Sequence, residues 1–103
     1  MPRQPLESLT EPMFYVLMAL CRAPMCGTDI ASFVQQKTSG TLVIGPATLY
    51  TILAKFEKEQ IIREVAVDGR RRTYRITEKG RAAYRAEFTR LQRCVADAQS
   101  EEV

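Results

Sequence analysis

Apolar residues recur with two different periods along this chain of 103 residues, and the change of period predicts its elements. Apolar residues spaced three and four apart predict four helices, over 11–22, 27–37, 47–60 and 78–99. Thr10 is expected to cap the first of these helices, and Ala23-Pro24 is expected to end it. Alternating apolar positions predict two strands over 61–67 and 70–77, joined by Asp68-Gly69 as a hairpin turn. Leu42-Val43-Ile44 is a short β-type run. The chain is therefore expected to be α+β, mostly α, and a single domain in size.

Three helices followed by a two-stranded hairpin is the order of a winged helix-turn-helix, in which the third helix enters the DNA major groove and the hairpin is the wing. The third predicted helix places Leu49, Ile52, Leu53 and Phe56 on one face, which is expected to pack inward. Its threonines suit base edges and its lysines suit phosphates. The candidate DNA-binding residues of this helix are Ala47, Thr48, Tyr50, Thr51, Lys55 and Lys58. An ordinary amphipathic helix with a solvated face would show the same pattern.

Charge is concentrated in one part of the chain. The chain carries 15 Lys+Arg and 12 Asp+Glu, a net charge of +3, yet residues 69–93 alone carry +7. A field of this kind attracts polyanions. Four arginines follow the hairpin turn and complete the candidate DNA-binding set: Arg70, Arg71, Arg72 and Arg75. A solubilising sheet edge is the alternative interpretation of these arginines. Alternation directs Tyr74 and Ile76 to the opposite, inward face.

The last predicted helix carries an apolar stripe of near-heptad spacing, made of Tyr84, Phe88, Leu91 and Val95. Because the first three helices already supply a core, the stripe predicts dimerisation with the same helix of a second copy, although it could also fold back on its own domain. We therefore expect a DNA-binding domain over 1–76 with its wing at 61–76. A dimerisation helix over 77–99 and an acidic tail over 100–103 follow it.

Composition argues against catalysis and metal binding. The chain has no histidine, the usual general base near neutral pH and the commonest metal ligand. Its three cysteines, Cys21, Cys26 and Cys94, lack C-x-x-C spacing. We expect no enzyme, no metal and no cofactor. The cysteines are expected to be reduced thiols, with a thiol sensor as the alternative. Neither an export signal nor a membrane span is evident, so a cytoplasmic location is expected.

Three stretches of the chain form distinctive motifs: Leu9-Thr-Glu-Pro-Met-Phe-Tyr-Val-Leu, Gly45-Pro-Ala-Thr-Leu-Tyr50 and Gly69-Arg-Arg-Arg-Thr-Tyr-Arg-Ile-Thr-Glu-Lys-Gly80. They resemble the signature regions of PadR-type transcriptional regulators, within a resemblance over residues 6–98. The resemblance implies a winged-helix homodimer that binds double-stranded DNA at a palindromic operator and represses transcription until an effector releases it. Because the chain ends after one C-terminal helix, it resembles the short subfamily.

The chain also departs from the family pattern. Cys26-Gly-Thr-Asp29 stands where the family often has His-Gly-Tyr-Glu, and Ala47 stands where glycine is common. Some members hold flat aromatic ligands with tryptophan, which this chain lacks. Four other aromatic residues form a candidate effector pocket, with simple packing as the alternative: Phe14, Tyr15, Tyr84 and Phe88. A winged-helix module that binds an acidic protein partner is the alternative function.

Overall fold

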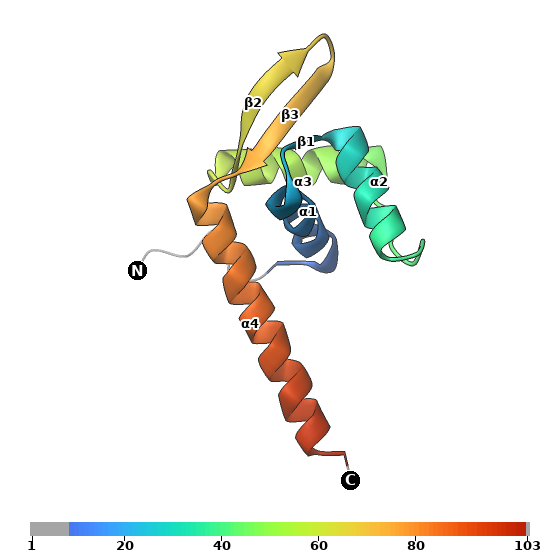
Figure 1. Ribbon diagram of the computed structural model, residues 1–103, viewed down its shortest axis with the longest axis vertical. Helices are drawn as coiled ribbons and strands as arrows, with labels where there is room; N and C mark the ends of the chain where they lie inside the picture. Colours follow the sequence, from blue (N-terminus) through green and yellow to red (C-terminus); the bar gives the residue numbers. More distant parts are fainter. Residues whose placement is uncertain (1–8, 103) are drawn as a thin grey trace.

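The computed structural model describes residues 9–102, which form four helices and a three-stranded antiparallel sheet (Figure 1). In chain order the elements are α1 (Glu11–Arg22), β1 (Met25–Cys26), α2 (Gly27–Lys37), α3 (Pro46–Lys58), β2 (Ile62–Asp68), β3 (Arg71–Ile76) and α4 (Glu78–Ser100). Three helices precede the hairpin and one follows it, which confirms the α+β, mostly α, winged helix-turn-helix. The first eight residues of the expected DNA-binding domain and Val103 of the expected tail lie outside the described residues.

The first helix begins where its sequence signals predict. The Thr10 hydroxyl accepts a hydrogen bond from the Met13 N–H at 3.3 Å, and the Thr10 N–H donates to the Met13 sulfur at 3.5 Å. Pro12 occupies the first turn, where a missing N–H is harmless. The helix ends at Ala23, whose extended backbone is the conformation that a residue before proline prefers. Its buried residues are Met13, Val16, Leu17, Ala19 and Leu20.

The third helix ends two residues earlier than expected, at Lys58 rather than residue 60. Gln60 adopts a left-handed backbone with φ of 62°. The Ile61 N–H then donates to the Phe56 carbonyl at 2.8 Å, and the Gln60 N–H donates to the Glu57 carbonyl at 3.0 Å, as in a Schellman motif. This turn reverses the chain and directs Ile61 and Ile62 into the core, where both are buried.

The predicted short strand at Leu42-Val43-Ile44 is wrong, because the structure has no strand at these residues. The Thr38 hydroxyl accepts from the Leu42 N–H at 3.1 Å and lies 2.9 Å from the Val34 carbonyl and 3.2 Å from the Leu42 carbonyl, so Leu42 bonds to the end of α2 rather than to a strand. The third strand is β1 instead. Its residues pair with β3 in an antiparallel register, Met25 with Tyr74 and Cys26 with Thr73.

The hairpin forms as expected, with its turn shifted by one residue. Asp68 is the last residue of β2 and pairs with Arg71, so the loop is Gly69-Arg70 rather than Asp68-Gly69. Gly69 has a φ of 64° and is the loop residue that tolerates this conformation without steric cost. A bulge between Glu64 and Ala66 interrupts the register in β2. As alternation predicts, Tyr74 and Ile76 are buried.

The fourth helix joins the hairpin at a tightly packed junction and then leaves the body of the molecule (Figure 1). Thr77 caps it by accepting a hydrogen bond from the Gly80 N–H at 3.0 Å. A Cβ at Gly80 would clash with the Ile61 carbonyl oxygen and lie 2.7 Å from Ile76 Cγ1, so only glycine fits this contact. Residues 91–100 are exposed throughout, while the first half of α4 packs on α1. In Figure 1 the hairpin and α4 extend in opposite directions from the other helices.

Candidate nucleic-acid interface

The third helix buries one side and exposes the other, as its sequence predicts. Leu49, Ile52, Leu53 and Phe56 are all buried. The side chains of the six candidate DNA-binding residues of this helix are all exposed: Ala47, Thr48, Tyr50, Thr51, Lys55 and Lys58. The exposed face therefore offers hydroxyl, aromatic and ammonium groups to a partner.

Thr51 and Tyr50 differ in the chemical groups that they can offer to a DNA base. The Thr51 hydroxyl donates to the Ala47 carbonyl one turn earlier, at 2.9 Å. Its hydrogen is thus engaged, and Thr51 retains its methyl group and the oxygen lone pairs for a partner. Tyr50 is 63% exposed, which is unusual for a large aromatic residue in a domain of this kind. Its ring and hydroxyl are both available to a ligand.

The wing arginines are distributed over different parts of the hairpin. Arg70 lies in the loop and Arg71 follows it at the start of β3, and both are exposed. Arg72 forms an ion pair with Glu64 at 3.6 Å, and Arg72 is itself largely exposed. Arg75 lies nearer the base of the hairpin, where its register partner is Arg63. The four arginines that the sequence grouped together therefore separate into a cluster at the tip and one residue at the base.

A groove of about 330 Å³ lies between α3 and the tip of the wing. Tyr50, Ala54 and Glu57 of α3 line one side of this groove. Arg70, Arg71 and Arg72 of the wing line the other side, and Thr28 at the start of α2 also contributes. The structure thus brings Tyr50 together with three of the predicted arginines, although the two sets lie about 20 residues apart in sequence. Ala47, Thr48, Thr51, Lys55 and Lys58 lie elsewhere on the exposed face of α3.

Glu57 gives this groove a negative charge that sequence reasoning did not assign. Burial raises the pKa of the Tyr74 phenol, and the charge of Glu57 raises it further. Arg72 acts in the opposite direction. Tyr74 therefore remains a neutral phenol in the wall of the groove at neutral pH. Tyr50, Ala54 and Glu57 are four and three residues apart, a spacing that could have predicted from the sequence that they share one face of the helix.

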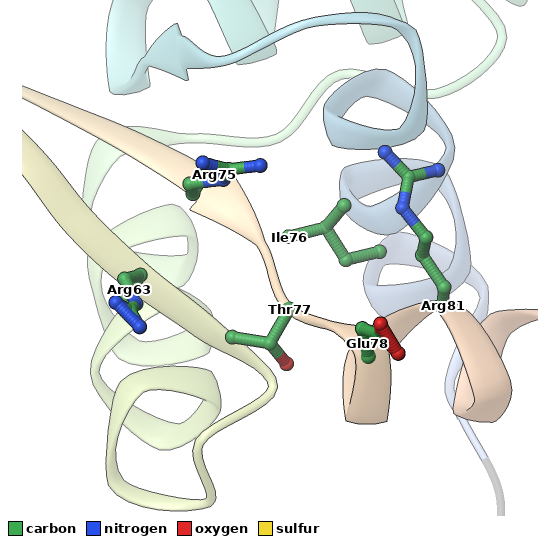
Figure 2. A pocket seen from close by; sticks show the side chains of 6 residues that line it. All are labelled: Arg63, Arg75, Ile76, Thr77, Glu78 and Arg81. Atoms are coloured by element: carbon green, nitrogen blue, oxygen red, sulfur yellow. The ribbon is translucent and has the colours of Figure 1, made fainter.

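A second cleft, of about 660 Å³, opens at the base of the wing (Figure 2). It gathers Arg75 with Arg63 of β2 and Arg81 of α4, neither of which the sequence analysis selected. Arg63 lies directly across the hairpin from Arg75. This position could have identified Arg63 as a member of the site, but it becomes evident only once the strand register is known. Arg81 reaches the cleft because α4 begins at Glu78, directly after the base of the hairpin.

The stripe predicted for dimerisation is mostly exposed in the single chain. Phe88, Leu91 and Val95 are 45%, 36% and 56% exposed, respectively. Tyr84 is half-buried, and its ring stacks on Phe14 with centroids 4.8 Å apart. Tyr15 meets Phe14 edge to face at 6.2 Å, and Phe88 lies 6.4 Å from Tyr84. The four residues of the candidate effector pocket thus form one aromatic cluster between α1 and α4.

A buried acid fixes α4 beside this cluster. The Glu87 side chain is only 6% exposed, and Arg90 donates to both of its carboxylate oxygens, at 2.9 and 2.6 Å. The hydrogen bonds from Arg90 lower the pKa of the Glu87 carboxyl. Burial acts in the opposite direction, while the charge of Arg90 and the Leu9 N–H lower the pKa further. The carboxylate is therefore ionised at neutral pH, and the Leu9 N–H, two residues before α1, also favours its charged form.

The three cysteines are free thiols that differ in exposure. Cys26 is buried, Cys94 is exposed and Cys21 is half-buried. Burial raises the pKa of the Cys21 thiol, with Arg81 and Arg85 acting in the opposite direction, so the reactive thiolate is disfavoured. Residues 9–102 contain no group of three or more His, Cys, Asp or Glu side chains that could hold a metal ion. None of the four helices has the length and apolar character that a membrane crossing requires.

The architecture defines a class: a winged-helix DNA-binding fold with an exposed third helix and a wing rich in arginine. Within that class, the chain matches the model of the transcriptional regulator PadR-like family over residues 16–86. The chain belongs to this family. The match covers a shorter segment than the 6–98 over which the sequence motifs suggested resemblance.

Two curated relatives share part of the chain. An uncharacterized 37.1 kDa protein in transposon TN4556 of Streptomyces fradiae is 36% identical over 66 residues, which is 64% of this chain and 19% of that protein. An uncharacterized protein X of Lysinibacillus sphaericus is 30% identical over 71 residues, which is 65% of each. The chain thus spans about a fifth and just under two thirds of the lengths of these relatives.

Solved structures share the fold at low sequence identity. A transcriptional regulator from Clostridium thermocellum is 23% identical with a TM-score of 0.79, and the match covers 93% of this chain and all of that one. RosR of H. salinarum is 18% identical with a TM-score of 0.68, covering 91% and 96%. The PcaV transcriptional regulator from Streptomyces coelicolor, solved in complex with its natural ligand, is 19% identical with a TM-score of 0.72, covering 94% and 65%.

Proposed function

We propose that this PadR-like chain is a cytoplasmic, sequence-specific DNA-binding regulator that reads DNA with α3 and the wing. The observation that carries the proposal is the groove that Tyr50 of α3 lines together with Arg70, Arg71 and Arg72 of the wing. A helix and a basic hairpin on the same side of a molecule suit a duplex, because a helix fits the major groove while arginine suits the adjacent minor groove and its phosphates.

The residues of α3 divide between base contact and phosphate contact. Thr48 and Tyr50 lie near the N-terminal end of the helix, the end that contacts base edges in helix-turn-helix proteins. Ala47 and the Thr51 methyl add small apolar contacts that suit a thymine methyl. Lys55 and Lys58 lie in the last turn and suit phosphates. Arg75 is proposed to contribute a phosphate contact from the base of the wing.

The proposed regulator is a homodimer held by α4. The exposed apolar stripe supports this, since Phe88, Leu91 and Val95 project from a helix that extends away from the body (Figure 1). Pairing of this stripe with that of a second copy would remove it from water. Two-fold symmetry would present two copies of α3 to a palindromic operator with half-sites one helical turn apart. In this division residues 1–76 form the DNA-binding domain, 77–99 the dimerisation helix and 100–103 an acidic tail.

Repression relieved by a small-molecule effector completes the proposal. The aromatic cluster of Phe14, Tyr15, Tyr84 and Phe88 supports an effector site, because it joins α1 of the DNA-binding domain to the proposed dimerisation helix. A flat ligand that inserted between Phe14 and Tyr84 would displace α4 relative to α1. Such a displacement would change the separation of the two copies of α3.

Sequence specificity is the property to test. Duplexes selected from a random pool by the purified protein should converge on a palindromic site. Fluorescence anisotropy with labelled duplexes then compares the affinity of the protein for the selected site with its affinity for a scrambled sequence. Thr48→Val should reduce the preference for the selected site by about 1–3 kcal/mol, the usual cost of one lost base contact. Thr89→Val, on the exposed surface of α4, should leave the preference unchanged.

The alternative, a module that binds an acidic protein partner, predicts a different result. In that case the selection would yield no common sequence, and the protein would bind selected and scrambled duplexes equally. Equal affinity for the two duplexes would therefore contradict sequence-specific reading.

A further inference from the structure

The cleft at the base of the wing has the composition of an anion-binding site. We propose that it binds an oxyanion, a phosphoryl or carboxylate group, through Arg63, Arg75 and Arg81. These three side chains line the cleft together with Ile76, Thr77 and Glu78 (Figure 2). Two hairpin strands and the first turn of α4 thus contribute one guanidinium each.

Each of the three arginines occupies a position that is locally unfavourable for a cation. Arg63 and Arg75 lie directly opposite each other in the β2–β3 register, and like charges in that arrangement repel. Arg81 lies at the end of the first turn of α4, where the partial positive charge of a helix N-terminus disfavours a cation. A bound anion would offset all three of these costs at once.

Among residues 9–102 these arginines have no ion-pair or side-chain hydrogen-bond partner. In the part of the chain that the structure describes, ion pairs join Arg72 with Glu64 and Arg90 with Glu87, and none involves these three arginines. No side-chain hydrogen bond from these arginines occurs among the same residues. Glu78 is the one acid lining the cleft, so three positive charges face a single negative charge.

The Thr77 hydroxyl, which lines the cleft, is already engaged by the backbone around it. The Thr77 hydroxyl shares its hydrogen between two carbonyl oxygens, that of Gln60 at 2.7 Å and that of Ile61 at 3.0 Å. Its oxygen accepts a hydrogen bond from the Gly80 N–H. Because the Gly80 contact admits no side chain, the hairpin and α4 are fixed relative to each other at this point. The three guanidinium groups are the cationic donors that line the cleft.

This cleft is distinct from the groove beside α3. Arg75 and Tyr74 are adjacent in β3, so their side chains lie on opposite faces of the hairpin. Tyr74 lines the α3 groove and Arg75 lines the basal cleft. The planar guanidinium fork matches the oxygens of a carboxylate or phosphoryl group. The oxyanion can come from a small free anion or from a phosphate of the DNA backbone, and only the second source rests on the proposed function.

Titration with inorganic phosphate tests the free-anion source. Nuclear magnetic resonance of backbone amides and arginine Nε–H groups, at constant ionic strength, should show saturable shifts at residues 63 and 75–81. Arg81→Gln should weaken phosphate binding about tenfold, as expected for loss of one hydrogen bond to a charged group. Arg93→Gln removes the same charge from an exposed position on α4 and should leave the affinity unchanged.

A salt titration with a duplex of mixed sequence tests the DNA source. If backbone phosphates occupy the cleft, Arg63→Gln and Arg81→Gln should each reduce the salt slope by about 1. If a free anion occupies it, the slopes stay at the wild-type value while phosphate binding saturates. The proposal is overturned if phosphate produces no saturable shifts and both variants retain the wild-type slope. Should the protein bind no duplex at all, the proposed function fails and the phosphate titration alone decides this proposal.

Discussion

At the scale of single residues, Gly80 shows how the junction between the wing and α4 depends on the absence of a side chain. A Cβ at this position would meet the backbone oxygen of Ile61, which cannot move without disturbing the turn at Gln60. We predict that Gly80→Ala destabilises the protein by about 1–3 kcal/mol, the usual cost of overpacking, despite the better helix propensity of alanine. Urea denaturation at fixed protein concentration measures this change.

Gly27→Ala provides the matched control. Gly27 is the first residue of α2, and a Cβ there would lie 3.6 Å from the nearest Leu49 atom, an ordinary contact. This substitution should be neutral or stabilise by up to about 1 kcal/mol, because alanine reduces the freedom of the unfolded chain. Equal effects of the two substitutions would contradict the role assigned to Gly80.

Glu87 predicts a pH dependence at the same scale. Its carboxyl has a pKa below the ordinary value of 4.5, because Arg90 hydrogen-bonds the ionised form. A group whose pKa is lowered by folding contributes stability above its unfolded pKa and loses it as the pH falls through the folded value. Glu87→Gln should therefore lower the free energy of unfolding at pH 7, and the difference from wild type should shrink as the pH falls below 4.5.

Asp97→Asn is the control for this measurement, since Asp97 is an exposed acid on the same helix. It should change the free energy of unfolding little at any pH. A difference between wild type and Glu87→Gln that stays constant from pH 7 down to pH 3 would rule out the ionised pair with Arg90 as its source.

At the scale of elements, α4 is the helix with an unpartnered apolar face. We predict that Leu91→Asp weakens self-association, because an aspartate would have to be buried in the proposed α4 interface. Sedimentation velocity over a range of concentrations should show a shift toward monomer. Thr89→Asp is the control, because Thr89 lies about 100° around the helix from Phe88 and away from the stripe.

An unchanged dimer in Leu91→Asp would contradict the α4 interface, and so would equal loss of dimer in both variants. Circular dichroism shows whether each variant keeps its helices. Since residues 91–100 are exposed, neither substitution should disturb the folding of the single chain.

The elements that local signals specify were predictable from the sequence. The Thr10 cap and the proline at 24 bound α1, the spacing of Leu49, Ile52, Leu53 and Phe56 set the orientation of α3, and alternation placed Tyr74 inward. These features depend on residues a few positions apart. The winged-helix order followed from them because the four helices and the two hairpin strands were predicted correctly, although the short strand expected at Leu42-Val43-Ile44 was not.

Features that depend on distant residues were not predictable in the same way. The strand β1 has two residues and exists only because β3 pairs with it. Gln60 ends α3 in a left-handed conformation that glycine or asparagine would have signalled. The bulge in β2 and the approach of α4 determine that Arg63 and Arg81 join Arg75. The cationic cleft was therefore invisible until the register and the junction were known.

At the scale of the whole molecule, the arrangement separates two surfaces. The exposed face of α3 and the tip of the wing share a groove, while the apolar stripe of α4 extends away from the body (Figure 1). Under the proposed function the first surface would bind DNA and the second a second copy, and the two surfaces share no residue. The basal cleft lies where the two parts join.

The salt dependence of DNA binding tests the central claim most directly. Fluorescence anisotropy with the selected duplex between 50 and 200 mM salt should give a steep log–log slope, of about −0.9 per phosphate contacted. The double variant Arg70→Gln/Arg71→Gln should reduce the magnitude of that slope by about 2, whereas Arg85→Gln/Arg93→Gln on α4, which removes the same charge, should leave it unchanged. A shallow slope for the wild type, or the same slope in both double variants, would contradict DNA binding by α3 and the wing.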